Sequence, residues 1–313
     1  MRIIFCGTPE FAVPSLQRLA QEPGISVEAV ITQPDRPRGR GRKIAAGAVK
    51  QAAVALDLQV YQPESIKSEE ASEFLRKIAP DAIVIIAFGQ IIPARLISLP
   101  RYGWINLHAS LLPKYRGAAP IAWAIANGET TTGLTTMRID AGMDTGPIVL
   151  REGISIHADE TAPELAARMA QAGAPLVLES MRLLEEEDFK PEPQDSSLAT
   201  IAPILKKEDG RIDWSLTAAQ VYNRMRAFAA WPGAYTTLRG RVWNIWGRPA
   251  PEAVAASTEG PGTIIASSSA VYVVCGGGST IEIEFAQAEG RKRVAAMDFA
   301  NGVHLVQGER FGA

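Results

Sequence analysis

The sequence contains few of the residues on which disulfide-linked and metal-centred proteins depend. Only two cysteines, Cys6 and Cys275, and three histidines occur among its 313 residues. The two cysteines lie far apart on apolar stretches, which is typical of a protein in a reducing compartment. Histidines and cysteines this few and this scattered do not supply the clustered ligands that a zinc site needs. We therefore expect neither a disulfide framework nor a bound metal.

Long apolar runs and a strong excess of charge are also missing. No stretch reaches the ~18 apolar residues of a membrane span, and charge returns at Glu10, which leaves the N-terminal apolar run too short for a signal peptide. The net charge of −2 excludes a general polyanion-coating protein, so any contact with nucleic acid must come from local basic patches. We expect a cytoplasmic monomer with no membrane partner.

The first part of the chain alternates between strands and helices. Strands are expected at 2–6, 27–31, 58–61, 82–88, 104–109, 133–139 and 147–156, and helices at 9–21, 48–56, 69–78, 119–127 and 161–187. Such alternation predicts an α/β fold with a Rossmann-like, mostly parallel sheet. The apolar run AIVIIAF at 82–88 is typical of a central parallel strand. We assign this sheet to a first domain at residues 1–188.

The character of the chain changes after the last long helix. Residues 189–206 are rich in proline and polar residues and are expected to form a linker. Beyond it, residues 207–313 show a helix near 213–229 and then short alternating strands separated by glycine and proline turns. This pattern predicts a second, smaller domain that is either a β-barrel or a β-sandwich.

The turn after the first strand is a poor nucleotide-binding motif. The stretch CGTPEFAVPS has one glycine where the dinucleotide fingerprint needs three, and Pro9 and Pro14 stand where the backbone would have to approach a phosphate. The sequence has no Gly-x-x-x-x-Gly-Lys-Ser/Thr motif either. An ordinary strand–turn–helix connection explains the stretch better than NAD or ATP binding does.

Two polar residues stand out on the strand expected at 104–109. Asn106 and His108 are two residues apart, so both side chains project from one face, at the end where parallel sheets bind ligands. Position alone favours a core histidine and a capping asparagine. Asp144, in the glycine-rich stretch IDAGMDTGP, is either a turn former or the group that orients the histidine.

Together, these three side chains would suit acyl transfer. A histidine takes a proton, an asparagine amide donates to a developing oxyanion, and an aspartate holds the histidine. No serine or cysteine stands in a recognised nucleophile motif, so the nucleophile would belong to the substrate.

The motifs around these residues resemble those of the folate-dependent formyltransferases, which carry a formyl group from 10-formyltetrahydrofolate to an amine. The resemblance rests on Asn106-Leu-His108, on SLLPKYRGAAP at 110–120 and on Asp144-Thr-Gly146. Five further stretches are similar to the members that act on methionine attached to initiator tRNA: IIFCGTPEFA at 3–12, TQPDRPRGRGRK at 32–43, RIDWSLTAAQ at 211–220, RAFAAWPGA at 226–234 and PGTI at 261–264. The resemblance covers nearly the whole chain. It implies 10-formyltetrahydrofolate as co-substrate, initiator methionyl-tRNA as partner, and no metal.

The resemblance also implies roles for individual residues. Asn106, His108 and Asp144 would be catalytic, and the folate site would be lined by Phe88, Gly89, Ser110, Leu111, Leu112 and Pro113. The first domain would carry the chemistry, and the second would be an OB-like barrel that holds the tRNA body. These roles agree with physical expectation. An asparagine amide and a protonated histidine can stabilise the oxyanion of formyl transfer, and the ordinary pKa of a histidine, near ~6.5, suits proton transfer at neutral pH.

Basic residues gather in the loop that follows the second expected strand. Five cations fall within eight residues: Arg36, Arg38, Arg40, Arg42 and Lys43. The loop is either a solvated charged segment or a mobile arm that clamps phosphate and orders on binding. In the resembled family, this loop meets the acceptor arm of the tRNA. The sequence departs from the family just after it, where AAGAVK at 45–50 replaces a Pro-Ser-Pro-Val-Lys run.

Further cations occur in the second expected domain. Lys206 and Lys207 are expected to contact the tRNA, and the basic stretches Arg239–Arg241 and Arg291–Arg293 suit a phosphate-tracking surface on a small barrel. The six tryptophans are expected to serve core and hinge packing rather than base stacking.

Two alternatives keep only part of this interpretation. In the first, the acceptor is a small amine, such as an amino-sugar nucleotide or a glycinamide of the purine pathway. In the second, the chain is a noncatalytic tRNA-binding module. The basic loop and the β-rich tail argue against the first alternative, and the grouping of Asn106, His108 and Asp144 argues against the second.

Overall fold

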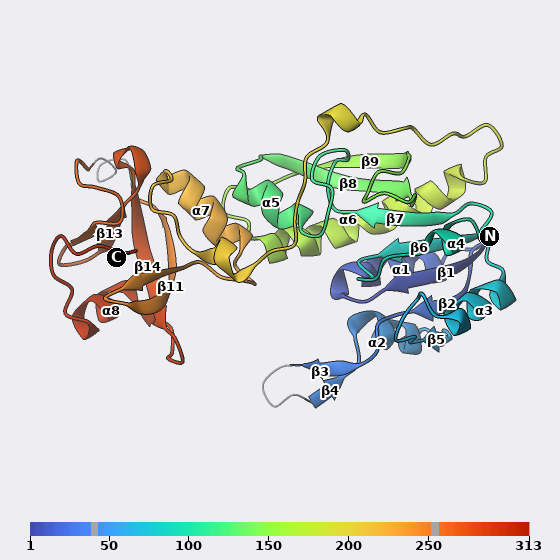
Figure 1. Cartoon of the computed structure of the whole chain (residues 1–313), viewed down its shortest axis with the longest axis horizontal. Helices are drawn as coiled ribbons and strands as arrows, with labels where there is room; N and C mark the ends of the chain where they lie inside the picture. The colour runs from blue at the N-terminus through green and yellow to red at the C-terminus, as the bar shows by residue number, and fades with distance from the viewer. Residues whose placement is uncertain (39–42, 252–256, 313) are drawn as a thin grey trace. The chain divides into compact units, whose positions relative to one another are not determined.

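The structure, a computed structural model, describes residues 1–38, 43–251 and 257–312. It divides into two compact units (Figure 1). The first unit comprises Met1–Pro120, Thr131–Ser155 and Leu165–Pro203, and the second comprises Ile121–Thr130, Ile156–Glu164 and Ile204–Ala313. The division that the sequence predicts, with a linker at 189–206, stays a prediction.

The first unit is built on a seven-stranded sheet with the order β5-β2-β1-β6-β7-β8-β9 (Figure 1). Its strands are β1 (Arg2–Gly7), β2 (Ser26–Ile31), β5 (Val60–Tyr61), β6 (Ala82–Ile86), β7 (Trp104–His108), β8 (Thr131–Arg138) and β9 (Ile148–Ser155). The five strands from β5 to β7 pair in parallel, whereas β8 is antiparallel to both of its neighbours. The expected Rossmann-like, mostly parallel sheet is therefore confirmed.

Helices connect these strands where the alternation predicts them. They are η1 (Glu10–Ala12), α1 (Val13–Ala20), α2 (Ala48–Ala55), α3 (Glu69–Ile78), α4 (Ala94–Ile97), α5 (Pro120–Ala126) and α6 (Ala162–Leu183). Helix α3 begins after Ser68, whose hydroxyl accepts a hydrogen bond from the Ala71 amide at 3.1 Å and so satisfies one N–H that a helix start leaves unpaired. Helix α4 was not expected, because four residues are too few to show a helical apolar period.

The centre of the sheet is fully covered on both faces. Ile3, Ile4, Ile83 and Val84, on β1 and β6, have no exposed surface. Consecutive apolar residues are what a parallel strand covered on both faces requires, and burying each such side chain stabilises the fold by roughly 1.5–3 kcal/mol. Strand β7 lies directly beside β6, with Asn106 opposite Ile85. The strand that carries Asn106 and His108 is thus anchored to the most buried part of the unit.

The second unit is built on an antiparallel sheet with the order β10-β11-β14-β13-β12, and β15 also pairs with β14 (Figure 1). Its strands are β10 (Tyr235–Leu238), β11 (Arg241–Pro249), β12 (Ile264–Ala266), β13 (Val271–Val274), β14 (Thr280–Ala288) and β15 (Val294–Ala295), and its helices include η3 (Lys207–Gly210), α7 (Ala218–Ala227), η5 (Gly276–Gly278) and α8 (Ala296–Gly302). The sheet curls into a half-barrel, which confirms the smaller OB-like fold. Trp214, Ile245, Val273 and Phe299 belong to its core.

Among the helices of residues 1–38, 43–251 and 257–312, none has both the length and the apolar character that a membrane span requires.

The two cysteines are buried, one in each unit. Burial disfavours a thiolate, so it raises the pKa of Cys6 and raises that of Cys275 to about 12. Because the thiolate is the reactive form, we expect neither cysteine to react with a thiol reagent at pH 8 in the folded protein. Titration with a chromogenic disulfide should detect two thiols per chain in denaturant and none without it. Rapid labelling of the folded protein would contradict this expectation.

Candidate active site

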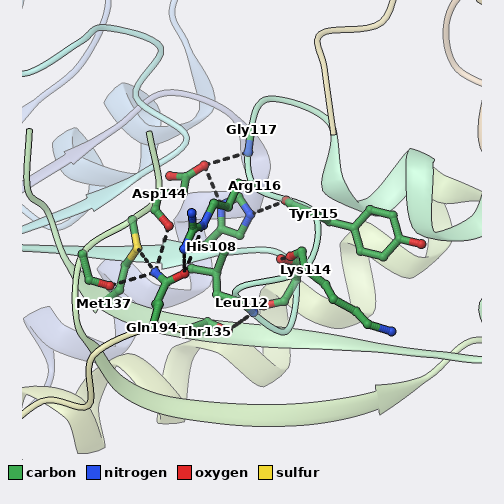
Figure 2. Close-up of polar contacts among 12 residues, drawn as sticks. His108, Leu112, Lys114, Tyr115, Arg116, Gly117, Thr135, Met137, Asp144 and Gln194 are labelled. Carbon is green, nitrogen blue, oxygen red and sulfur yellow. Dashed lines mark hydrogen bonds and ion pairs between the residues drawn. The ribbon is translucent and has the colours of Figure 1, made fainter. Parts of the chain in front are cut away.

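The three proposed catalytic side chains come from the end of β7 and from the loop between β8 and β9. Asn106 and His108 lie on β7, and their alternation along the strand directs both side chains to one face. Asp144 lies in the loop that joins β8 to β9, and Figure 2 shows its carboxylate close to the His108 ring. The structure thus brings His108 and Asp144 together from positions 36 residues apart.

The imidazole of His108 is held by its two ring nitrogens. Nε2 lies 2.9 Å from the backbone oxygen of Tyr115. Because a carbonyl oxygen can only accept, Nε2 carries the hydrogen of this bond. Nδ1 faces Asp144, with 3.6 Å between Nδ1 and Oδ2 (Figure 2). Nδ1 is therefore the ring nitrogen that the bond to Tyr115 does not use, and it faces a carboxylate.

The loop of Asp144 is shaped by its backbone. Asp144 has a φ of 53°, in the left-handed region that few non-glycine residues adopt. Its Oδ2 accepts a hydrogen bond of 2.8 Å from the Gly117 amide, which fixes the carboxylate between His108 and the loop that follows β7. The side chain retains 19% of its surface exposed, so a substrate can reach it. Gly146 allows the chain to pass close to the Arg138 carbonyl, where any Cβ would collide.

The amide of Asn106 is free to bind a ligand. Asn106 pairs with Met137 across β7 and β8, and its side chain is half-buried. It makes no hydrogen bond to any residue in the described part of the chain. A half-buried amide with an unused N–H, on the same strand face as His108, can donate to an oxygen that becomes negatively charged in a reaction.

The loop expected to line the folate site is fixed against β8. The Thr135 hydroxyl donates to the Ser110 carbonyl at 2.6 Å and accepts from the Leu112 amide at 3.0 Å. The side chains of Ser110 and Leu112 are buried, whereas those of Leu111 and Pro113 are partly exposed. A ligand at this loop would therefore meet backbone groups together with Leu111 and Pro113.

Phe88 and Gly89 lie just beyond β6, at the same end of the sheet as the end of β7. The Phe88 side chain is only 2% exposed, and its carbonyl accepts hydrogen bonds from Thr8 and Gln33 at 3.3 and 3.2 Å. Gly89 has a φ of +83°. The ring of Phe88 is thus part of the core, and its proposed contact with folate would have to come from the backbone.

Sequence reasoning missed Gln194, which joins the loops of the site (Figure 2). Its Nε2 donates to the carbonyls of Asp144 and Gly146, both at 2.8 Å. Its Oε1 accepts from Nη2 and Nε of Arg116, at 2.7 and 3.1 Å, and the Arg116 side chain is buried. One amide therefore ties the Asp144 loop to the loop after β7.

Gln194 belongs to a segment that the sequence indicates is a linker. In the structure, Glu192 pairs with Ile148 through two backbone hydrogen bonds of 2.7 Å. Thr200 accepts hydrogen bonds from the amides of Tyr115 and Arg116, each at 2.8 Å. A proline-rich, polar segment has no periodicity that would predict such long-range bonds, so nothing in the sequence pattern pointed to Gln194.

The residues expected to bind tRNA belong to other segments of the chain. The basic loop forms a two-stranded hairpin of β3 (Arg36–Arg38) and β4 (Lys43–Ala45), which pair antiparallel. Arg36 is exposed, and Arg40 and Arg42 lie outside the described residues. Lys206 and Lys207 are exposed at the start of η3 in the second unit. The roles of these residues stay predictions.

The close approach of Gly146 to the Arg138 carbonyl can be tested by measuring the stability of a variant. Gly146→Ala would push a methyl group into the Arg138 carbonyl and displace the Asp144 loop. We expect the free energy of unfolding to fall by about 1–3 kcal/mol, the usual cost of overpacking. Gly153→Ala, on β9, is the matched control, because no atom lies within 4 Å of its Cβ. Urea denaturation checks both variants, and equal stabilities would show that the approach at Gly146 is not constrained.

Comparisons with known proteins show the family of the chain. A model of the formyl transferase family matches residues 1–181, and a model of the formyl transferase C-terminal domain matches residues 204–304. A methionyl-tRNA formyltransferase of Solibacter usitatus (strain Ellin6076) is 52% identical over 313 residues, which cover 100% of this chain and 99% of that protein. A methionyl-tRNA formyltransferase of Acidobacterium capsulatum is 48% identical and covers 100% of both chains.

One solved structure has a fold similar to that of this chain. The sugar 3N-formyl transferase WlaRD, crystallised in the presence of dTDP and 5-N-formyl-THF, superposes with a TM-score of 0.66 over 93% of this chain and 99% of that chain. At 20% identity, this likeness supports the fold alone. The full-length relatives and the two family models confirm the resemblance that the sequence motifs indicated. The chain belongs to the methionyl-tRNA formyltransferase family and is a formyl-group transferase.

Proposed function

We propose that the chain transfers a formyl group from 10-formyltetrahydrofolate to the free amino group of methionine on initiator methionyl-tRNA, in the cytoplasm, for translation initiation. The observation that carries the proposal is the His108–Asp144 pair, at 3.6 Å, beside the unused amide of Asn106. This arrangement has a proton acceptor and an oxyanion donor but no protein nucleophile. An amine substrate that attacks a bound formyl group supplies the missing nucleophile.

The identity of the donor is supported by the family and by the loop after β7. The WlaRD structure was determined with a formylated tetrahydrofolate, and its fold is similar to that of this chain. The loop from Ser110 to Pro113 is held rigidly by Thr135, and it follows directly from His108. A rigid loop with partly exposed Leu111 and Pro113 suits a flat, largely apolar ring system.

The proposed reaction balances with these residues. The neutral amine attacks the formyl carbon, a C–N bond forms, and the carbonyl electrons move onto the oxygen. The Asn106 amide donates to this oxyanion. The surplus proton of the new ammonium passes to the His108–Asp144 pair at Nδ1 and from there to N10 of the folate as the C–N10 bond breaks. The hydrogen bond from Nε2 to Tyr115 keeps the ring oriented throughout.

The choice of tRNA as acceptor rests on the full-length relatives and on local clusters of basic residues. The relatives that cover the whole chain are named for methionyl-tRNA. The proposed contacts with the phosphate backbone are the basic stretch of Arg36, Arg38, Arg40, Arg42 and Lys43, together with the exposed Lys206 and Lys207. A small amine would not need basic residues in two separate segments of the chain.

One assay separates the proposed acceptor from the alternatives. The purified protein is incubated with 10-formyltetrahydrofolate, labelled in the formyl group, and with either methionyl-tRNA or an amino-sugar nucleotide. Label in the methionine of the charged tRNA is the expected result. Label on the sugar amine alone would show a small-amine acceptor, and binding of tRNA without transfer would show a noncatalytic module.

The proposed catalytic residues have distinct expected effects. Asn106→Ala removes one oxyanion donor and should lower kcat about 10²–10³-fold. His108→Ala and Asp144→Ala each remove one side chain of the pair that takes up the proton of the amine. Each should lower kcat about 10²–10⁴-fold, whereas folate affinity changes little. The exposed His157→Ala is the control for loss of a histidine. Steady-state kinetics and folate titration test these expectations, and near-normal turnover of His108→Ala would refute the mechanism.

Gln194 should act by positioning Asp144. Gln194→Glu keeps an oxygen for Arg116 but replaces two donors with an oxygen that faces the carbonyls of Asp144 and Gly146. We expect kcat to fall about 10–10²-fold, with the KM for tRNA unchanged, because a displaced catalytic group costs rate rather than binding. Ser196→Ala is the control, since its bond to Arg116 is long, at 3.5 Å. A change confined to KM would contradict the positioning role.

A further inference from the structure

A row of three side chains crosses the sheet of the first unit. His108 on β7 lies opposite Thr135 on β8, and Thr135 lies opposite Arg151 on β9. Residues that face each other in an antiparallel pair project from the same face of the sheet, so the three side chains lie in line. His108 and Thr135 both form hydrogen bonds with the loop that follows β7. Arg151 continues this row on the last strand of the sheet.

Arg151 holds the same loop at the Leu112 carbonyl. Its Nε donates to that oxygen at 3.2 Å, and the Leu112 amide donates to Thr135 at 3.0 Å (Figure 2). The Leu112 side chain is 2% exposed and packs in a cluster with Met137 and Ile148. The amide, the carbonyl and the side chain of Leu112 are therefore all held by residues of β8 and β9.

The Arg151 guanidinium is held in turn by Glu192. Nη1 lies 2.9 Å from Oε2 of Glu192, and Nη2 lies 3.3 Å from Oε1. Such a two-point ion pair fixes the plane of a guanidinium as well as its position. The backbone of Glu192 is itself anchored to β9, because it exchanges two hydrogen bonds of 2.7 Å with Ile148. The carboxylate therefore occupies both Nη atoms and leaves Nε to the Leu112 carbonyl.

We propose that Arg151 is a positioning residue that fixes the loop around Leu112 in the conformation that binds folate, with Glu192 holding its guanidinium. The inference rests on the folate part of the proposed function, in which Leu111 and Pro113 meet the folate ring system. Leu112 lies between these two residues, so a shift of its backbone moves both of them. A loop that is ordered before binding adds no ordering cost, whereas a loop that the ligand must order loses affinity.

Glu192 and Gln194 hold different parts of the site. They are two residues apart in the segment that follows α6. Gln194 donates to the Asp144 carbonyl at 2.8 Å, whereas Glu192 acts on Leu112 through Arg151. Loss of Gln194 is expected to lower kcat, and loss of Arg151 should weaken folate binding with little change in kcat. The two effects should therefore be independent of each other.

A direct contact between Arg151 and the carboxylates of the folate tail predicts the opposite effect of Glu192. The Arg151 side chain is 33% exposed, so a ligand carboxylate can reach it. In that case Glu192 competes with the ligand, and Glu192→Ala would strengthen folate binding. A positioning role predicts that Glu192→Ala weakens it. The contacts favour positioning, because Nε, Nη1 and Nη2 each already donate to a group of the protein.

The test measures binding of tetrahydrofolate to the full-length protein by titration calorimetry. Arg151→Met should raise the Kd about five- to tenfold, because the loop is no longer ordered before the ligand binds. Glu192→Ala should raise it about two- to fivefold, since the bond from Nε to the loop remains. Arg76→Met is the matched control and should leave the Kd unchanged. It removes an ion pair on α3 whose carboxylate, Glu69, is 64% exposed, against 65% for Glu192.

Double variants test whether Arg151 and Glu192 act together. Arg151→Met/Glu192→Ala should have the Kd of Arg151→Met, because Glu192 acts only through Arg151. An unchanged Kd in Arg151→Met, a lower Kd in Glu192→Ala, or full additivity of the two changes would overturn the proposal. Urea denaturation identifies any variant that does not fold. If Arg151→Met is such a variant, Glu192→Ala carries the test, because its carboxylate is exposed.

The outcome for Arg151 is separate from the outcome for the proposed acceptor. In the formylation assay, Arg151→Met should raise the KM for 10-formyltetrahydrofolate by the factor seen in the Kd, and kcat and the KM for methionyl-tRNA should change by less than about twofold. If the unmodified protein formylates methionyl-tRNA and Arg151→Met has the same folate KM, only the positioning role fails. If the unmodified protein does not formylate methionyl-tRNA, the proposed function fails, and the tetrahydrofolate titration still decides the role of Arg151.

Discussion

The hydrogen bond from His108 Nε2 to the Tyr115 carbonyl is the contact on which the site depends. It assigns a hydrogen to Nε2, because a carbonyl oxygen can only accept, and turns the other ring nitrogen, Nδ1, toward Asp144. The loop that carries Tyr115 therefore sets which ring nitrogen faces the carboxylate, and in the proposed mechanism that nitrogen takes the proton of the amine.

The buried sheet and the hydrogen-bonded loops both support that contact. The fully buried strands β1 and β6 hold β7 in the sheet, and β7 carries Asn106 and His108. The loops that supply Tyr115 and Asp144 have no regular structure. Their backbone is fixed instead by hydrogen bonds that Thr135 and Thr200 accept and that Gln194 donates. The geometry at the end of β7 is therefore fixed in two ways. The sheet holds the strand, and side chains that form hydrogen bonds with the loop backbone hold the loops.

Much of this arrangement was predictable from local patterns in the sequence. The strand–helix alternation and the run at 82–88 predicted the parallel sheet, and the spacing of Asn106 and His108 predicted that they share a face. The hydrogen bonds of Gln194 were not predictable. They join residues that are 48 and 50 positions apart in the chain, and such contacts leave no local pattern in the sequence.

The bonds made by the segment from Glu192 to Ala202 have a consequence for domain exchange. This segment returns to Ile148, Asp144 and Arg116 before the chain continues into the second unit. A chimaera joined at residue 188 would replace those bonds with the sequence of the donor protein, even though every proposed catalytic side chain stayed in place. A junction after Ala202 would retain them. The natural point for joining this sheet to a different second unit therefore lies downstream of Ala202.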